Sequence, residues 1–343
     1  MNLDSVLAAR TLALVDISSA TGSEAEIARY VRDAMTLEPE WDDGDVLFFR
    51  TPGEPRVLLA GHLDTVPAQD NLPGRLEGGF VVGLGASDMK GGLAVMIELA
   101  RAGVGAGYLF FTREEGPAEE SPLPSFLEAC RAAREAKLAI MLEPTDNTIQ
   151  AGCLGNLVAR LVLYGTSAHS ARPWTGHNAI HEAIRALTPV ASMEPVDVEV
   201  EGLVFREVLS VVAIEGGIAD NVVPDHASCR LNFRYAPHRS AEQAEQRLRE
   251  LLPGGELEVL SNSPGAPVAV ELPLVRALRE AGGFEVEPKQ AWTPVAQFAA
   301  AGIDAVNLGP GATGYAHRRD ERVEVRELTR TFDALRRFLG GSV

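Results

Sequence analysis

The stretch LLAGHLDTVP, residues 58–67, is an apolar run that ends on a histidine and an aspartate before a proline interrupts it. A short apolar run bounded by turn residues predicts a buried strand. In an α/β sheet, the carboxyl ends of the strands open into the crevice where ligands bind. Because His62 and Asp64 are two residues apart, they leave an extended chain on the same face, and Asp64 can orient the imidazole ring of His62.

Other predicted elements in the first half of the chain are also followed by acidic side chains. Strands are expected over residues 56–63, 106–112 and 137–143, with a helix over 91–103. The acids beside them are Asp88 in a glycine-rich turn, Glu114 and Glu115 after the second strand, and Glu143 at the end of the third. His317 follows a later apolar run, IDAVNL. Imidazole and carboxylate ligands suit Zn²⁺, so these positions predict a metal site.

The pattern of the chain changes after residue 153 and changes back after residue 264. Strands expected over 155–165, 206–214, 227–235 and 256–260, with helices over 177–187 and 241–252, follow the order β-α-β-β-α-β. That order is ferredoxin-like. We therefore predict an α/β fold in which residues 1–153 and 265–343 form one domain with a helix-covered mixed sheet, and residues 154–264 form an inserted domain. In the first domain, Ser23 and Glu26 have capping-box spacing, which predicts a helix start at Ser23.

Composition excludes several classes of partner. The chain has 343 residues and a formal net charge of −17, which disfavours binding to nucleic acid or to an anionic membrane. No apolar run approaches the roughly 20 residues of a membrane span. The three cysteines are widely spaced and odd in number, so they do not form a disulfide framework. We expect a cytoplasmic protein.

The motifs GHLDTVP, ASDMKGG, EEG, EPT and AHRRDE, in this order, resemble those of the M20 family of metal-dependent amidohydrolases and peptidases. The stretches IQAGCLGN, GTSAHSARP and DNVVPD extend the resemblance over nearly the whole chain. The resemblance is strongest to succinyl-diaminopimelate desuccinylases of the actinobacterial type. It implies removal of the succinyl group from N-succinyl-LL-2,6-diaminopimelate. The alternative is an acetylornithine deacetylase or another N-acyl amino-acid hydrolase or peptidase of the family.

The resemblance also implies a metal centre and a catalytic base. The implied ligands are His62 and Glu143 for one Zn²⁺, Glu115 and His317 for a second, and Asp88 as the bridge between them. Co²⁺ is expected to be able to substitute. Glu114 would be the general base that acts on a metal-activated water, and a cis peptide is expected between Asp88 and Met89.

The inserted domain would then serve as a lid and dimerisation domain of a homodimer. By resemblance, His169 would cross the dimer interface and stabilise the oxyanion, while Asn221 and Arg234 would bind a substrate carboxylate. The chain departs from the family in TPVAQF, where Pro294 and Gln297 replace an aspartate and an arginine. An arginine at position 297 could have bound a substrate carboxylate, so this departure bears on which substrate the chain accepts.

Three other interpretations were weighed. GPGATG, residues 309–314, fits the dinucleotide fingerprint, but no predicted helix begins directly after it. His177 and His181 lie one helical turn apart without the glutamate of an H-E-x-x-H site, which favours a structural pair. A binding module that has lost the chemistry would lack at least one of the key groups, and all of them are present.

Overall fold

The computed structural model describes residues 2–53, 56–252 and 254–340, and divides the chain into two compact units. Unit 1 contains Met1–Gly152, Ala269–Glu287 and Pro294–Val343, and unit 2 contains Cys153–Val268 and Pro288–Thr293. The sequence placed the second break after residue 264. Unit 2 is longer because the Lys289 carbonyl accepts a hydrogen bond from the Leu154 N–H (3.3 Å) and Trp292 Nε1 donates to the Pro264 carbonyl (3.2 Å).

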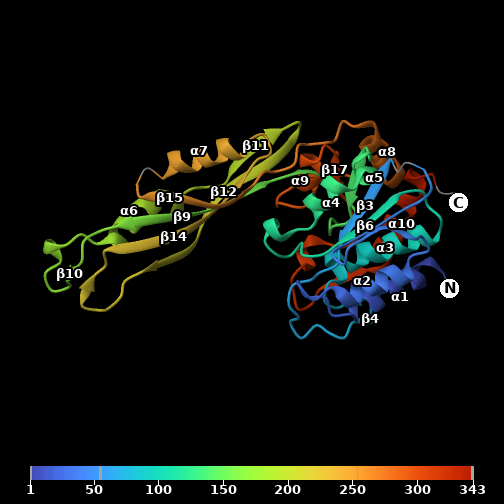
Figure 1. The fold of residues 1–343 in the computed structure, drawn as a ribbon, viewed down its shortest axis with the longest axis horizontal. Coiled ribbons are helices and arrows are strands. Elements are labelled where there is room, and N and C mark those ends of the chain that lie inside the picture. Colours follow the sequence, from blue (N-terminus) through green and yellow to red (C-terminus); the bar gives the residue numbers. More distant parts are fainter. Residues whose placement is uncertain (1, 54–55, 253, 341–343) are drawn as a thin grey trace. The chain divides into compact units, whose positions relative to one another are not determined.

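An eight-stranded mixed sheet forms the centre of unit 1, which confirms the predicted α/β class (Figure 1). Its strand order is β1 (Pro39–Asp42), β2 (Val46–Arg50), β6 (Gly107–Phe111), β3 (Val57–His62), β7 (Leu138–Met141), β17 (Ala305–Asn307), β8 (Ile149–Cys153) and β16 (Val286–Lys289). β3 is parallel to β6 and β7, and β7 is parallel to β17. The carboxyl ends of these four strands therefore lie at one edge of the sheet.

Helices cover both faces of the central strands. Every residue of β3, β6 and β7 is buried, and successive side chains of a strand point to opposite faces. The helices are α1 (Leu3–Val15), α2 (Ala25–Ala34), α3 (Gly91–Arg101), α4 (Leu123–Ala129), α5 (Arg131–Arg134), α8 (Pro273–Gly282), α9 (Val295–Ala300) and α10 (Val325–Phe338). Helices α1, α3 and α10 pack against one another, whereas α9 packs on β7 and β17 with α4 beside it. A small sheet, in the order β18 (Arg322–Glu324), β5 (Phe80–Val82) and β4 (Arg75–Glu77), completes unit 1.

The glycine at position 61 allows the segment before α3 to lie against β3. A Cβ atom on Gly61 would lie 2.5 Å from Met89 Cε and 2.7 Å from Leu93 Cδ2, closer than atoms can pack. The missing side chain thus brings Met89 onto the end of β3. Asp88 is consequently held beside His62.

Helix α2 begins later than the sequence predicted. It starts at Ala25 with Glu24 as its N-cap, and no side chain caps it, so the predicted capping box at Ser23 is wrong. The Glu24 carboxylate instead accepts the N–H of Arg113 (3.3 Å), in a distant loop. The side chain at the N-cap position therefore makes a tertiary contact and leaves α2 without a side-chain cap.

Unit 2 contains a five-stranded antiparallel sheet. Its order is β11 (Val196–Val200), β12 (Leu203–Gly216), β14 (His226–Tyr235), β9 (Gly155–Tyr164) and β15 (Glu256–Ser263). Together with α6 (Ala179–Ala191) and α7 (Ala241–Leu251), it contains the predicted β-α-β-β-α-β order and one further strand, β11. The sequence of β11, VDVEV, alternates apolar and acidic residues, and Glu201 and Gly202 both have positive φ, as a tight hairpin turn requires.

The helices of unit 2 lie over one face of its sheet. Leu161 of β9 and Leu231 of β14 are fully buried there and belong to one core with Ala183 of α6 and Leu248 of α7. The residues that alternate with them on β9 and β14, such as Arg160 and Arg230, are exposed. Unit 2 therefore has one helix-covered face and one open face.

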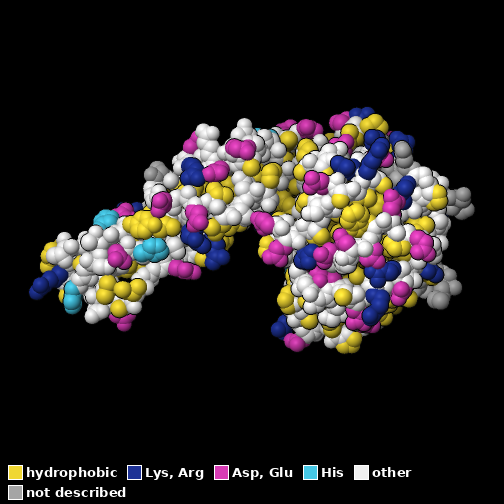
Figure 2. Space-filling model, in the orientation of Figure 1, with side chains coloured by type: hydrophobic (Ala, Val, Ile, Leu, Met, Phe, Trp, Pro, Cys, Tyr) yellow, Lys and Arg dark blue, Asp and Glu magenta, His cyan; other side chains and the backbone are white. Residues whose placement is uncertain are grey.

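Within the described ranges, no helix is both long and apolar enough to cross a membrane. Figure 2 shows acidic and basic side chains interspersed on the visible face, without a continuous basic patch there.

Candidate metal centre

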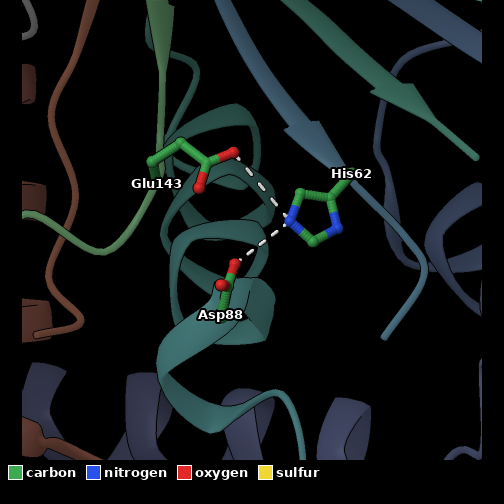
Figure 3. Close-up of side chains that lie close together, drawn as sticks. All are labelled: His62, Asp88 and Glu143. Carbon is green, nitrogen blue, oxygen red and sulfur yellow. Dashed lines mark hydrogen bonds and ion pairs between the residues drawn. The ribbon is translucent and has the colours of Figure 1, made fainter. Parts of the chain in front are cut away.

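His62, the last residue of β3, is almost completely buried and directs its Nε2 atom toward two carboxylates. Nε2 lies 3.1 Å from Asp88 Oδ1 and 3.9 Å from Glu143 Oε1 (Figure 3). Nδ1 lies 3.0 Å from the backbone carbonyl of Asp64. A carbonyl oxygen only accepts hydrogen bonds, so Nδ1 carries the proton and Nε2 faces the carboxylates. Burial lowers the pKa of His62, but the surrounding carboxylates outweigh it and hold that pKa well above its usual value.

A second cluster forms around the other oxygen of Asp88. His317 Nε2 lies 2.9 Å from Glu115 Oε1 and 3.5 Å from Asp88 Oδ2. Asp88 and Glu115 are largely buried, whereas the His317 side chain is half exposed. Hydrogen bonds that His317 donates to the carboxylates of Asp88 and Glu115 raise its pKa to about 10, although burial opposes this. The peptide between Asp88 and Met89 is cis, as the family resemblance implied.

Asp64 fixes the loop that carries the two adjacent glutamates. Its two carboxylate oxygens accept the backbone N–H groups of Glu114 and Glu115, each at 3.0 Å, and Thr21 Oγ1 donates to it at 2.9 Å. Burial acts to raise the pKa of Asp64. The interactions with His62 and with these N–H groups outweigh burial and lower that pKa to about 2. An ionised Asp64 thus holds both His62 and the glutamate loop.

Glu114 belongs to the same cluster of side chains. Its carboxylate, that of Glu115 and the His62 ring each offer an atom within 4.8 Å of the others. Burial, followed by the charges of neighbouring carboxylates including Glu143, raises the pKa of Glu114 well above its usual value, although His62 opposes this. Geometry alone therefore makes Glu114 a candidate ligand as well as a candidate base.

The donor set fits two divalent metal ions. His62, Asp88 and Glu143 form one group of converging ligand atoms, and Asp88, Glu115 and His317 form another, each within 4.8 Å. The groups share Asp88, whose two oxygens face different histidines. Three nitrogen or oxygen ligands with one position left open is the arrangement of catalytic zinc sites. A cation at each position would also offset the repulsion between the buried carboxylates.

The predicted residues of unit 2 lie at opposite ends of its sheet. His169 of β10 (Ala168–His169) pairs with Val222 of β13 (Val222–Val223), and the Asn221 carbonyl accepts the Ser170 N–H at 2.9 Å. Both lie beyond the end of the sheet where His226 pairs with Tyr164. Arg234 lies at the other end, opposite Asn156. Arg234 lies eight residue steps along the extended strand from His226, a distance of about 26 Å.

The exposed His169 ring is held by a local hydrogen bond. Its Nδ1 accepts the N–H of Ala171 at 3.0 Å, so in the neutral ring the proton is on Nε2. Arg234 is partly buried, which lowers its pKa, and it donates through Nε to Asn232 at 2.9 Å. No carboxylate within ion-pair distance of Arg234 is found in the described part of the chain.

One residue near the cluster had no predicted role, and one predicted histidine pair lies outside the cluster. Glu321, in the motif AHRRDE, received no role, yet its buried carboxylate lies beneath the loop of Asp88. Its place four residues after His317 was the available signal. In the pair of His177 and His181, the exposed His177 side chain contacts Glu182 (2.8 Å). Among the described residues, neither histidine belongs to a metal-capable group.

The profile of peptidase family M20/M25/M40 matches residues 58–340. A Mycobacterium tuberculosis protein, DapE, provisionally named succinyl-diaminopimelate desuccinylase, is 41% identical over 96% of this chain and 97% of its own. The succinyl-diaminopimelate desuccinylase of Corynebacterium glutamicum is 36% identical over 96% and 95%. Among solved structures, the Bacillus subtilis YXEP protein, described as a dinuclear metal-binding peptidase of the M20 family, matches with a TM-score of 0.70 at 15% identity, covering 98% and 97% of the two chains.

Proposed function

Because the chain belongs to peptidase family M20/M25/M40 and is a metal-dependent amide hydrolase, we propose that it removes the succinyl group from N-succinyl-LL-2,6-diaminopimelate. The observation that carries the chemistry is the pair of ligand groups that share Asp88. The choice of substrate rests on the relatives at 41% and 36% identity, both of which carry the desuccinylase name.

We assign one Zn²⁺ to His62, Glu143 and Asp88, and a second to Glu115, His317 and Asp88, with Co²⁺ able to substitute. This assignment leaves Glu114 without a metal. Its carboxylate lies within 4.8 Å of ligand atoms of His62, from the first group, and of Glu115, from the second. Bound zinc lowers the pKa of water and polarises an amide carbonyl. Two metal ions also agree with the description of the B. subtilis relative.

The protein's own groups then handle the protons. Glu114 takes a proton from the attacking water, and it returns that proton to the amine nitrogen when the amide bond breaks. Asp64 keeps the His62 ring and the Glu114 loop in place through its hydrogen bonds. His169 donates from Nε2 to the oxygen of the carbonyl as negative charge develops on it. The products are succinate and diaminopimelate.

The placement of Asn221 and Arg234 supports a homodimer in which unit 2 is the lid and dimerisation domain. A small N-acyl amino acid cannot reach both residues of one subunit across about 26 Å of strand. We propose that one site takes Arg234 from one subunit and His169 and Asn221 from the other. Because a two-fold axis makes such an exchange reciprocal, each dimer would contain two complete sites.

A candidate surface for this dimer is the outer edge of β12. Strand β11 pairs only with Leu203–Glu207 of β12, so residues 208–216 have a strand neighbour on one side only among the described strands. Val212 and Ile214 on this segment are 56% and 58% exposed. Pairing with the same edge of a second copy would satisfy the open backbone and bury these side chains.

An acetylornithine deacetylase or another N-acyl amino-acid hydrolase is the alternative function. It is favoured by the departure at Gln297, whose side chain accepts a hydrogen bond from Ser121 Oγ (3.2 Å) and provides no charge for a substrate carboxylate. Hydrolysis of matched succinyl and acetyl amino acids with added Zn²⁺, together with metal analysis, tests both functions. Faster cleavage of succinyl substrates supports the desuccinylase, whereas a protein that holds no stoichiometric metal contradicts both.

A further inference from the structure

The carboxylate of Glu321 lies beneath the loop that carries Asp88. Its Oε2 accepts the N–H of Gly85 at 2.8 Å, and its Oε1 accepts the N–H groups of Ser87 and Asp88, both at 3.0 Å. The backbone carbonyl of Glu321 also accepts the Gly83 N–H at 2.9 Å. Only 1% of Glu321 is exposed, so water does not compete for these hydrogen bonds.

The loop needs these acceptors because its backbone is irregular. Asp88 (φ −121°, ψ 95°) and Met89 (φ −128°, ψ 34°) are not helical, and Gly85 has a positive φ of 75°. Its N–H groups therefore lack the regular partners of a helix. A carboxylate only accepts hydrogen bonds and has two oxygens, so one side chain can hold three converging N–H donors. Glu321 thus determines where the backbone of Asp88 lies.

The segment that supplies Glu321 also supplies a candidate metal ligand. His317 precedes Glu321 by four residues, and the N–H of Glu321 donates to the Arg318 carbonyl (3.2 Å), which closes the turn between them. His317 Nε2 lies 3.5 Å from Asp88 Oδ2. Because Asp88 belongs to both candidate metal groups, a shift of its backbone would alter both of them at once.

We infer that Glu321 is a positioning residue that holds the bridging Asp88 at the distance both metal ions require, an inference that rests on the proposed metal-dependent function. Glu321 belongs to neither candidate metal group and acts only through the backbone of residues 85–88. Groups that orient metal ligands in this way typically change metal affinity by about 10- to 100-fold when they are replaced.

The substitution Glu321→Gln tests the inference because it retains the shape of the side chain and turns one acceptor into an NH₂ donor that faces N–H groups. Zn²⁺ affinity, measured by competition with a chromophoric chelator, should fall about 10- to 100-fold at both sites. The visible absorption of the Co²⁺-loaded protein should change as well. The matched control is Glu98→Gln, a buried carboxylate of the same unit that pairs with Arg10 (2.8 Å). It should lower the melting temperature without changing metal affinity.

Two outcomes separate the inference from the proposed function. If Glu321→Gln lowers the melting temperature yet binds both metals with wild-type affinity and an unchanged Co²⁺ spectrum, Glu321 is only a structural brace and the inference fails. If the wild type and Asp88→Asn bind Zn²⁺ equally weakly, the metal site itself is wrong. Glu321→Asp, one methylene shorter but still charged, is the second variant, and its affinity should fall between those of the wild type and Glu321→Gln.

Discussion

Asp64 accepts a hydrogen bond from the backbone N–H of Glu114, with 3.0 Å between Oδ1 and N. The same oxygen lies 3.5 Å from Nδ1 of His62, and the other oxygen accepts the N–H of Glu115. One buried carboxylate therefore connects the end of β3 to the loop after β6. Of these contacts, only the one with His62 was predicted from the sequence.

Replacing Asp64 with asparagine should loosen both connections. The amide NH₂ of Asp64→Asn would face the N–H of Glu114 or Glu115, so we expect Zn²⁺ affinity or activity to fall by about 10- to 100-fold. Asp43→Asn is the control, because Asp43 also accepts two backbone N–H groups, those of Asp45 and Val46, in an exposed turn. Equal losses in the two variants would show that the effect of Asp64 is not specific to the site.

Glu114 and Glu115 should differ in what their substitution removes. Glu114→Gln should retain both metals and lose about 10²- to 10⁴-fold in kcat, because only the proton acceptor is lost. Glu115→Gln should instead weaken the binding of one Zn²⁺. Metal analysis of both purified variants measures this directly, and equal loss of zinc from the two would contradict the division of roles.

Arg234 should distinguish succinyl from acetyl substrates. A charge-assisted hydrogen bond from Arg234 to the free carboxylate of the succinyl group would contribute about 1.5–3 kcal/mol. Arg234→Met should therefore lower kcat/KM for a succinyl substrate by about 10- to 100-fold and leave that for an acetyl substrate unchanged. Arg230→Met, on the exposed part of the same strand, is the control. An equal loss of kcat/KM for both substrates would show that Arg234 does not bind the succinyl carboxylate.

Subunits carrying His169→Ala and Glu114→Gln should complement each other. Each homodimer is expected to be inactive, but a mixed dimer combines an intact Glu114 site with the intact His169 of its partner, so activity should return at one site in two. Refolding the two variants together and assaying the mixture measures this. A mixture shown to have exchanged subunits, yet without recovered activity, would rule out the cross-subunit role.

Removal of metal should destabilise unit 1, because a metal ion that binds only the folded arrangement of Asp88, Glu115 and Glu143 stabilises the folded state. Zn²⁺ at about 100 times its Kd stabilises a folded protein by about 2.7 kcal/mol per site, which corresponds to about 5–10 °C in melting temperature for a unit of this size. Calorimetry with and without a chelator measures the difference. Unchanged melting in the presence of the chelator would argue against metal binding at this cluster.

The α/β class, the family and the convergence of the metal-capable side chains could all be predicted from the sequence. Each ligand type follows an apolar strand or opens a helix, and parallel strands bring their carboxyl ends to one edge of the sheet. Local pattern therefore sufficed to place His62, Glu115 and Glu143 in one region. The strand β11 carried an alternating pattern as well, and its omission was an error of interpretation.

Other features arise only from packing between distant segments. The Glu24 side chain contacts the N–H of Arg113 and does not cap α2. The contact of Glu321 with the loop of Asp88 joins segments more than 200 residues apart. The separation of Asn221 from Arg234 follows from the length of β14 and its register with β9. Hydrophobic periodicity states which face of an element is buried, but not which distant backbone it meets. Those partners are determined by how the strands and helices pack, so only the tertiary structure reveals them.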